Sequence, residues 1–449
     1  MNTPFKAVLL AVCTLLASNN VMAWANHTLI SQGLLESMPE VANAPPVAVE
    51  SLESFLMASE AQLAPFLAQQ EDWMQKNLRH YEPLPDALAF KASGNAEDIR
   101  QRFTHAIRIN PNSRLNLYLQ MTPGHESGQG VPLDAAEITI YNDNSYLDNI
   151  TILQLQPGDK VSAMDVVISA NDEPDHGLDI GLYTDSNTEH GKLYGFGEQP
   201  FGNPKLEYGT QAPFHMGFYH EPELVFAAGG FLKRTYPEFR IQQFKHLSEF
   251  AFKNGHPYWG WRFMGLGLHY VGDFSNPYHT TPVAGNSTLS TIWVGLLSMA
   301  GFTGPQNDAV QIVSNRHTAI EEFQQTVMTK AFEHQQADHV ALQATRGAES
   351  AGAYQANFVI DVFAKSGYEQ ADLLDEVILQ TMPEKFVSDV EVEFSQVPER
   401  HQLVEKIREH KGQAAVDTLN KTLAELLTLF GENGKSYVQG ILKASTLNP

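Results

Sequence analysis

Three side chains that commonly bind metal ions, His269, Asp273 and His279, lie close together in the spacing H-x3-D-x5-H. Imidazole nitrogen and carboxylate oxygen form a ligand combination that suits zinc. His269 and Asp273 are four residues apart, so a helix would place both on one face. An ordinary surface pair has the same spacing, but the third ligand that follows favours a metal-dependent hydrolase.

The element expected to position the first two ligands is a helix within residues 235–275, a stretch rich in aromatic side chains. Proline cannot continue a helix, so the pattern predicts a break at Asn276-Pro277. The break would turn His279 around, toward a second metal ion.

Further potential ligands are spread along the chain, which has 17 histidines. Their spacing separates three groups from the remaining histidines. These groups are Trp24 with His27, the acidic stretch 171–179 followed by His215 and His220, and His317 with Glu321, a second pair four residues apart.

The first 23 residues predict a secretory signal peptide. Lys6 supplies the positive charge, and the apolar run 7–17 is much shorter than the roughly 20 residues of a membrane span. Val21-Met22-Ala23 matches a cleavage site. Cleavage after Ala23 would make Trp24 the first residue of a secreted or periplasmic chain.

The only cysteine, Cys13, lies within this predicted signal. It allows an alternative, a lipoprotein signal, although Val12 is bulkier than the residue that usually precedes the lipidated cysteine. A mature chain without Cys13 has neither thiols nor disulfides. Its metal ligands must then come from histidine, aspartate and glutamate.

The composition is that of a globular protein with a sizeable core, since 43% of the 449 residues are hydrophobic and 10% are aromatic. This length allows one large domain or two to three ordinary ones. The formal net charge of −23 argues against tight non-specific binding to nucleic acid or to anionic membranes. We therefore expect no nucleic-acid partner and no transmembrane segment.

These features together resemble the zinc-dependent phospholipase C and S1–P1 nuclease superfamily. Its members carry three zinc ions in a helical domain. Their ligands include the amino group and carbonyl of a mature N-terminal Trp, followed by His, Asp, His, H-x3-D-x5-H and finally H-x3-E or H-x3-D. Here a cleavage site precedes Trp24, the triad spacing is met, and His317 with Glu321 gives H-x3-E.

The resemblance implies three zinc sites, with Asp273 bridging two of the ions. The other implied ligands are Asp175, His215 and His269 at one bridged ion, Trp24 and His27 at the other, and His279, His317 and Glu321 at the third ion.

Two of these ligands have alternatives, because the gaps around them are longer than in familiar members. Asp179 could take the place of Asp175, and His220 could take the place of His215. The gap between His27 and Asp175 implies a large insertion.

The sequence around the triad resembles bacterial phospholipases C more than nucleases, and Glu321 stands where nucleases usually carry Asp. The resemblance implies hydrolysis of a glycerophospholipid at a membrane surface, with phosphatidylcholine as the default substrate. The products would be diacylglycerol and a phosphorylated head group. Zinc would offset charge on the phosphate oxygens and activate a water molecule, and Asp175 or another acid in the stretch 172–179 is the candidate general base. A nuclease or a non-catalytic metal-binding protein of the same fold are the alternatives.

A choline head group would need aromatic faces for cation–π contact. The candidates near the motifs are Phe214, Phe218, Tyr219, Tyr258, Trp259 and Tyr278.

We expect a mainly α protein, with a catalytic domain like that of the phospholipases C and nucleases. Some β-structure is expected at 131–170, where Glu137 to Tyr141 alternate in polarity. The apolar run 288–302 is expected to be a core helix, with an interfacial role as the alternative. The expected division is a signal at 1–23, a catalytic domain at 24–345 with an insertion at about 48–170, and a helical C-terminal region at 346–449. The oligomeric state stays open.

Overall fold

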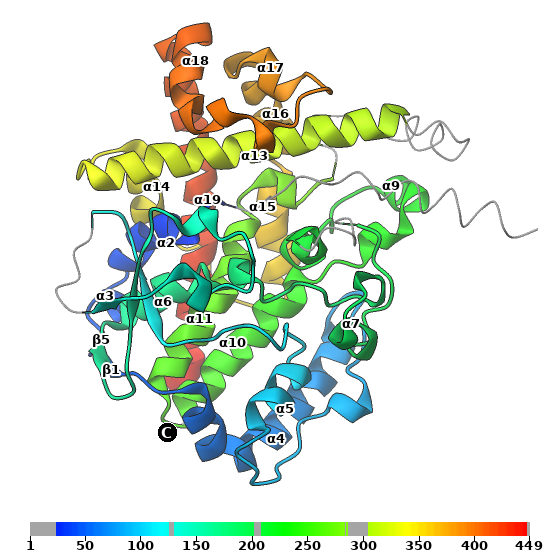
Figure 1. Cartoon of the computed structure of the whole chain (residues 1–449), viewed down its shortest axis with the longest axis vertical. Helices are drawn as coiled ribbons and strands as arrows, with labels where there is room; N and C mark the ends of the chain where they lie inside the picture. The colour runs from blue at the N-terminus through cyan, green and yellow to red at the C-terminus, as the bar shows by residue number, and fades with distance from the viewer. Residues whose placement is uncertain (1–23, 125–129, 202–207, 283, 286–303, 447–449) are drawn as a thin grey trace, which may run out of the picture.

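The computed structural model describes residues 24–124, 130–201, 208–282, 284–285 and 304–446. The predicted signal peptide and the apolar run 288–302 lie outside the described residues. Helices dominate the described chain, which confirms the prediction of a mainly α protein (Figure 1). No helix in the described ranges is long and apolar enough to cross a membrane.

Two central helices, α10 (Pro237–Lys253) and α11 (Pro257–Asp273), form a hairpin that runs through the middle of the molecule (Figure 1). The sequence predicts helix across 235–275 without the break that separates them. Gly255 lies at that break with a φ of +81°, a backbone conformation that favours glycine. Every residue of α11 from Tyr258 to Asp273 is buried, so this helix has no solvent face.

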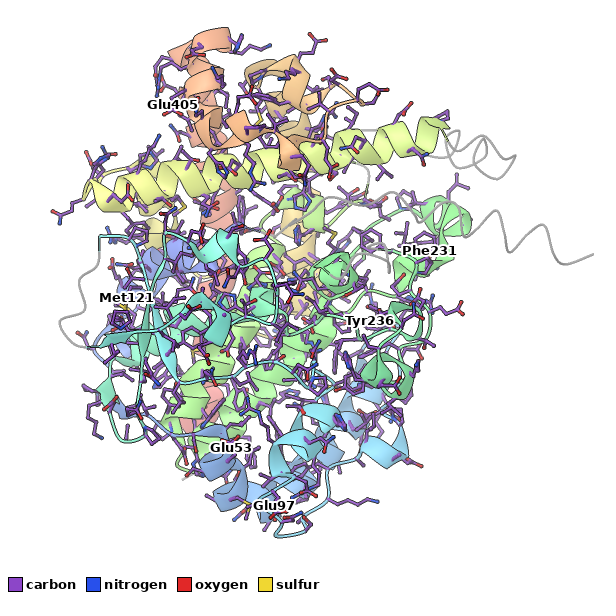
Figure 2. All side chains as sticks on the ribbon, in the orientation of Figure 1. Glu53, Glu97, Met121, Phe231, Tyr236 and Glu405 are labelled. Carbon is purple, nitrogen blue, oxygen red and sulfur yellow. The ribbon has the colours of Figure 1, made fainter. Side chains whose placement is uncertain are left out.

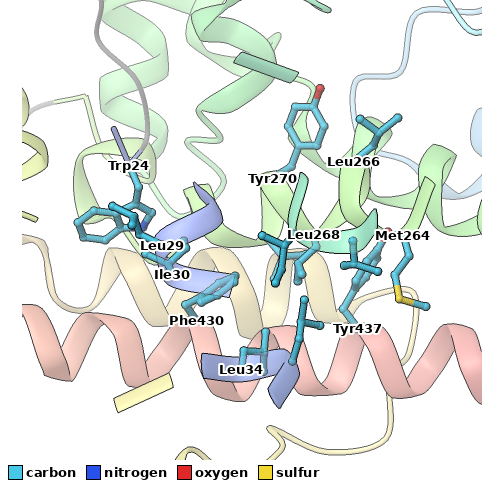
Figure 3. Close-up of a cluster of buried hydrophobic side chains, with 14 of the residues drawn as sticks. Trp24, Leu29, Ile30, Leu34, Met264, Leu266, Leu268, Tyr270, Phe430 and Tyr437 are labelled. Atoms are coloured by element: carbon cyan, nitrogen blue, oxygen red, sulfur yellow. The ribbon is translucent and has the colours of Figure 1, made fainter. Parts of the chain in front are cut away.

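Three helices from distant parts of the chain enclose α11. They are α2 (His27–Glu36), α6 (Ala163–Ala170) and α19 (Gln413–Thr446). Leu34 of α2, Leu268 of α11 and Phe430 of α19 meet in one hydrophobic cluster (Figure 3). The N-terminal helix and the C-terminal region therefore share a single core with the central hairpin.

The β-structure is small and antiparallel. One sheet has the order β2 (Tyr118–Met121), β4 (Thr151–Gln154), β3 (Val131–Pro132), and β1 (Val47–Ala48) pairs with β5 (Lys160–Val161).

Strands β3, β4 and β5 lie within 131–170, where some β-structure is expected, but the alternating segment from Glu137 to Tyr141 is not a strand. The chain there leaves a short 3-10 turn, η2 (Ala135–Glu137), and continues as a loop. Ile138 is buried against Tyr118 and Ile152 of the sheet. The alternation therefore arises from a loop that covers the sheet, and not from a strand within it.

Some of the remaining helices lie at the two ends of the molecule. The long helix α13 (Gly304–Glu333) crosses one end, and Glu405 of α18 lies beyond it, whereas Glu53 of α4 lies at the opposite end (Figure 2). The region 346–449, which is expected to be helical, contains α15, α16, α17, α18 and α19. The other helices are α3 (Pro39–Ala42), α4 (Leu52–Asn77), α5 (Ile99–Ala106), α7 (Glu189–Leu193), α8 (Ala212–His215), α9 (Glu223–Ala228), α14 (Val340–Gly347), α15 (Lys365–Tyr368), α16 (Ala371–Thr381), α17 (Glu384–Val387) and α18 (Leu403–Lys411).

Close packing of α6 against α11 requires a glycine at position 265. A Cβ atom there would lie 2.6 Å from the carbonyl oxygen of Val167 and 2.6 Å from the Cβ of Ala170. We expect Gly265→Ala to lower the free energy of unfolding by about 1–3 kcal/mol, because overpacking forces the helices apart. Urea denaturation measures the change.

The matched control is Gly347→Ala in α14, where an added Cβ would meet no atom within 4 Å. This control should leave the free energy of unfolding unchanged or raise it slightly, since alanine favours helix. Equal stability of the two variants would contradict the packing argument.

Candidate metal centre

The last turn of α11 carries His269 and Asp273, and both side chains are completely buried. Three other segments deliver side chains to the same point. His27 begins α2, Asp175 lies in the 3-10 helix η4 (Glu173–His176), and His215 ends α8. They form two overlapping clusters, His27–His269–Asp273 and Asp175–His215–His269, and the potential ligand atoms in each lie within 4.8 Å of one another.

A third cluster joins His279 to His317 and Glu321 on α13. The chain turns sharply after Asp273, as the sequence predicts, and the side chain of Asn276 caps the short helix η8 (Pro277–His279). Nε2 of His279 lies 3.0 Å from Nε2 of His317, which in turn lies 2.6 Å from Oε1 of Glu321. The break after α11 therefore brings His279 to a pair of side chains nearly forty residues further along the chain.

Hydrogen bonds to backbone carbonyls indicate which ring nitrogens face these clusters. Nδ1 of His269 donates to the carbonyl of Asn171 at 2.8 Å, and Nδ1 of His279 donates to the carbonyl of His215 at 2.8 Å. Each Nε2 then presents a lone pair. Nε2 of His269 faces Nδ1 of His215 at 3.0 Å, as Nε2 of His279 faces His317. In each pair a shared proton or a metal cation can bridge the two ring nitrogens.

Several buried polar atoms in the first two clusters make no hydrogen bond. They are both ring nitrogens of His27, both carboxylate oxygens of Asp175, Nε2 of His215 and Oδ1 of Asp273. An unsatisfied buried polar atom is unfavourable, and native proteins contain few of them. Their convergence on one point fits a bound metal ion, which imidazole nitrogen and carboxylate oxygen can both ligate.

The pKa values of the acidic groups and histidines beside α11 indicate an environment that favours a bound cation. Burial raises the pKa of the Asp175 carboxyl to about 8. Burial also opposes ionisation of Asp273, but His269, His215 and His27 hold its pKa well below the usual range. For His215, burial opposes the charged ring, yet Asp179 and Asp273 raise its pKa to about 10. The carboxylates around His215 thus favour a cation at this position.

In the third cluster, the pKa values of both histidines are lowered rather than raised. Burial lowers the pKa of His279 to about 3, with a further contribution from His317. Burial also lowers the pKa of His317 to about 3. Both rings are therefore neutral near pH 7, and neutral imidazole is the form that binds metal.

Asp175 and its alternative as a ligand, Asp179, have different surroundings. Oδ1 of Asp179 accepts hydrogen bonds from Nε and Nη2 of Arg240 at 2.8 and 2.6 Å, and Oδ2 accepts one from Tyr270 at 2.5 Å. Oδ2 also lies 3.5 Å from Nε2 of His215. Asp179 therefore stands behind His215 and orients its ring, whereas Asp175 lies inside the cluster.

His215 and its alternative as a ligand, His220, also have different surroundings. Nε2 of His220 lies 2.8 Å from the carbonyl oxygen of Ile360, and its ring packs near Tyr368. His220 therefore lies outside the three clusters, and His215 occupies the place between Asp273 and His269.

Trp24 is completely buried beside the turn that follows α11. Its Nε1 donates to the carbonyl of Gly272 at 3.2 Å and to Oγ of Ser275 at 3.0 Å, on either side of Asp273. The indole ring thus anchors the start of the described chain next to the clusters. Metal binding by its amino group and carbonyl stays a prediction.

The aromatic residues considered for a choline pocket lie mainly in the interior. Phe214 and Trp259 are completely buried, and Tyr258 and Phe218 are nearly so. Tyr278 stacks on the ring of His317, with the ring centroids 5.4 Å apart. These side chains build the core around the clusters and leave no open aromatic pocket among themselves.

A cleft of about 520 Å³ opens beside Glu321. Its walls come from α13, from the segment just before α2, and from the loop that precedes β4. Its lining is mainly polar and includes Asn26, Tyr146, Asp148, Thr318, Glu322, Lys330, Glu333 and Arg400. The cleft gives the third cluster a route to solvent.

Comparison with protein-family models, with curated proteins and with solved structures found no match. The case for a metal centre therefore rests on the side chains themselves. These side chains are buried, their potential ligand atoms converge, and several of those atoms make no hydrogen bond.

The site also depends on residues that the sequence did not single out. Arg240 holds Asp179, and Asn171 fixes the ring of His269. Asn171 begins the acidic stretch 171–179, and this position was the feature of the sequence that could have indicated its role. Arg240 is a cation between Phe239 and Ile241 of α10, a pattern that suggests a buried ion pair but does not identify its partner.

Asp175 and Asp179 should behave differently when each is replaced in metal-free protein prepared with EDTA. Asp179→Asn should lower the free energy of unfolding by about 3–5 kcal/mol, because the buried charge of Arg240 loses its partner. Asp175→Asn removes a carboxylate that has no hydrogen-bond partner, so stability should stay unchanged or rise. Metal bound per chain, measured by plasma mass spectrometry, should fall in Asp175→Asn.

A large loss of metal-free stability in Asp175→Asn, with full metal content retained, would contradict this division of roles between the two aspartates.

Proposed function

We propose that this protein is a zinc-dependent phosphodiesterase that hydrolyses glycerophospholipids. The observation that carries the proposal is the convergence of three clusters of imidazole and carboxylate groups around the end of one buried helix. Their donor atoms suit zinc. The sequence resemblance to the phospholipases C supports the same reaction.

The geometry of Asp273 supports a bridging role between two ions. Its Oδ1 lies 3.4 Å from Nε2 of His27 and 3.6 Å from Nε2 of His269. Its Oδ2 lies 3.1 Å from Nδ1 of His215. The two oxygens thus face different clusters, so a single carboxylate can serve both.

Zinc bound at such clusters supplies positive charge to a phosphate group and makes water easier to deprotonate. Asp175 is the proposed base, because its oxygens are free of hydrogen bonds and lie 3.8 and 3.9 Å from ring nitrogens of His269 and His215. Asp179 keeps the ring of His215 in place. The buried walls around these groups exclude bulk water.

The cleft beside Glu321 is the proposed entry for the substrate. Its volume of about 520 Å³ is in the range of small-molecule sites. Its polar lining suits a head group and a phosphate more than acyl chains, which would stay at the membrane. The guanidinium of Arg400 in the lining can hydrogen-bond a phosphate oxygen.

A nuclease activity fits the cleft less well. Asp148, Glu322 and Glu333 line it, and the whole chain carries a net charge of −23. These negative charges oppose a nucleic-acid strand, which carries one charge per phosphate.

The proposed activity can be tested with two substrates, short-chain phosphatidylcholine and single-stranded DNA. We expect release of phosphocholine, its loss after EDTA treatment and its recovery on addition of zinc. Cleavage of DNA alone would make the protein a nuclease. Bound zinc without turnover of either substrate would make it a binding protein.

The proposed role of Trp24 predicts that the exact start of the mature chain matters. Protein that begins at Trp24 should be active, whereas protein with two extra residues before Trp24 should lose most activity and part of its zinc. The reason is that Trp24 is buried beside Asp273, so an extension blocks its amino group. Equal zinc content and activity in the two proteins would reject this role.

A further inference from the structure

Two consecutive residues, Asn171 and Asp172, hold the backbone of His27. The amide of His27 donates to Oδ1 of Asp172 at 2.7 Å. Nδ2 of Asn171 donates to the carbonyl oxygen of His27 at 3.1 Å. All of these groups are buried, so both polar backbone atoms of His27 are fixed by side chains from a segment more than 140 residues away.

The ring of His27 has weaker polar support, because its Nε2 lies 3.4 Å from Oδ1 of Asp273, which is longer than an ordinary hydrogen bond. Neither ring nitrogen makes a hydrogen bond. The ring packs against that of His269, with the centroids 3.9 Å apart, and lies close to Gly272, where a Cβ would be 3.1 Å from Nδ1 of His27. The direction of the ring therefore depends on packing and on the backbone contacts.

Asp172 is itself held by a buried chain of hydrogen bonds. Its Oδ2 accepts from Nε2 of Gln120 at 2.5 Å. Oε1 of Gln120 lies 3.2 Å from Nε2 of His176, and Nδ1 of His176 lies 3.1 Å from the hydroxyl of Tyr146. Tyr146 lines the cleft beside Glu321. The chain therefore connects the cleft wall to the backbone of His27.

The carboxylate sets the direction of the first two bonds in this chain. Asp172 accepts only, so Gln120 turns its amide nitrogen toward it and its oxygen toward His176. Nε2 of His176 must then donate, which leaves Nδ1 as an acceptor facing the hydroxyl of Tyr146, and that hydroxyl also lies within donating distance of Oγ1 of Thr139, at 2.9 Å. Reversing one group would place two donors or two acceptors opposite each other. Breaking one contact therefore disturbs the next.

We propose that Asp172 is a positioning residue for the metal ligand His27, and that Gln120, His176 and Tyr146 keep Asp172 in place. The inference rests on the proposed function only in taking His27 as a ligand. It assigns these residues an effect on one ion, the one nearest His27. The cluster of His279, His317 and Glu321 is held by other contacts, such as that of His279 with the carbonyl of His215, so its affinity for metal should not change.

The test is a zinc titration of metal-free protein in competition with a chromophoric chelator. Asp172→Asn keeps the size of the side chain but places Nδ2 opposite Nε2 of Gln120. We expect the affinity for one zinc ion to fall about 10- to 100-fold, as for other groups that orient metal ligands. Gln120→Met should act in the same direction with a smaller effect, because Asp172 itself remains.

The matched control is Glu60→Gln. Glu60 is also a buried carboxylate that accepts backbone N–H groups from a distant segment, at 3.0 Å from Ser93 and 2.9 Å from Gly94. It lies on α4, away from the clusters. This variant should bind zinc as the wild type does.

The melting temperature of each metal-free variant separates positioning from general stability. Selective loss of one zinc ion with an unchanged melting temperature supports the proposal. Unchanged affinity, or an equal loss for every ion together with a lower melting temperature, overturns it. If Asp172→Asn does not fold, Gln120→Met decides by the same criteria. Wild-type protein that binds no zinc would instead overturn the proposed function.

Discussion

The carboxylate of Asp273 is the group on which the surrounding structure depends. It lies at the end of a helix with no solvent face, where an isolated charge would be strongly unfavourable. The fold meets this constraint by bringing three histidines from separate segments to its two oxygens. Those segments are in turn fixed by their own buried contacts, so one charge organises the start of α2, the end of α8 and the end of α11.

The parts of the site close in sequence could be predicted well. The spacing of His269 and Asp273 defined one helical face, and Asn276-Pro277 marked the turn that redirects His279. The pair His317 and Glu321 was recognisable for the same reason, because a helix places residues four apart on one side. In each case the geometry is set within one or two turns of backbone.

Contacts between distant segments could not be predicted from the local spacing of residues. Asp172 and His27 are 145 residues apart, and Arg240 and Asp179 are 61 apart. No local pattern fixes which buried cation meets which carboxylate. The choice between Asp175 and Asp179 was open for this reason, and in space the hydrogen bonds of Arg240 and Tyr270 to Asp179 distinguish the two. The alternation of Glu137 to Tyr141 misled in a similar way, since burial beneath a loop produces the same pattern as a strand.

The position of α19 has a consequence for how the protein matures. This helix packs on both α2 and α11, so it forms part of the wall behind the clusters. A ribosome makes α11 well before α19, and the apolar surface that the two helices share stays uncovered until the later one is available. Long-range contacts of this kind slow folding. The clusters can therefore reach their final geometry only after α19 has been made, which delays assembly of the centre until the chain can close around it.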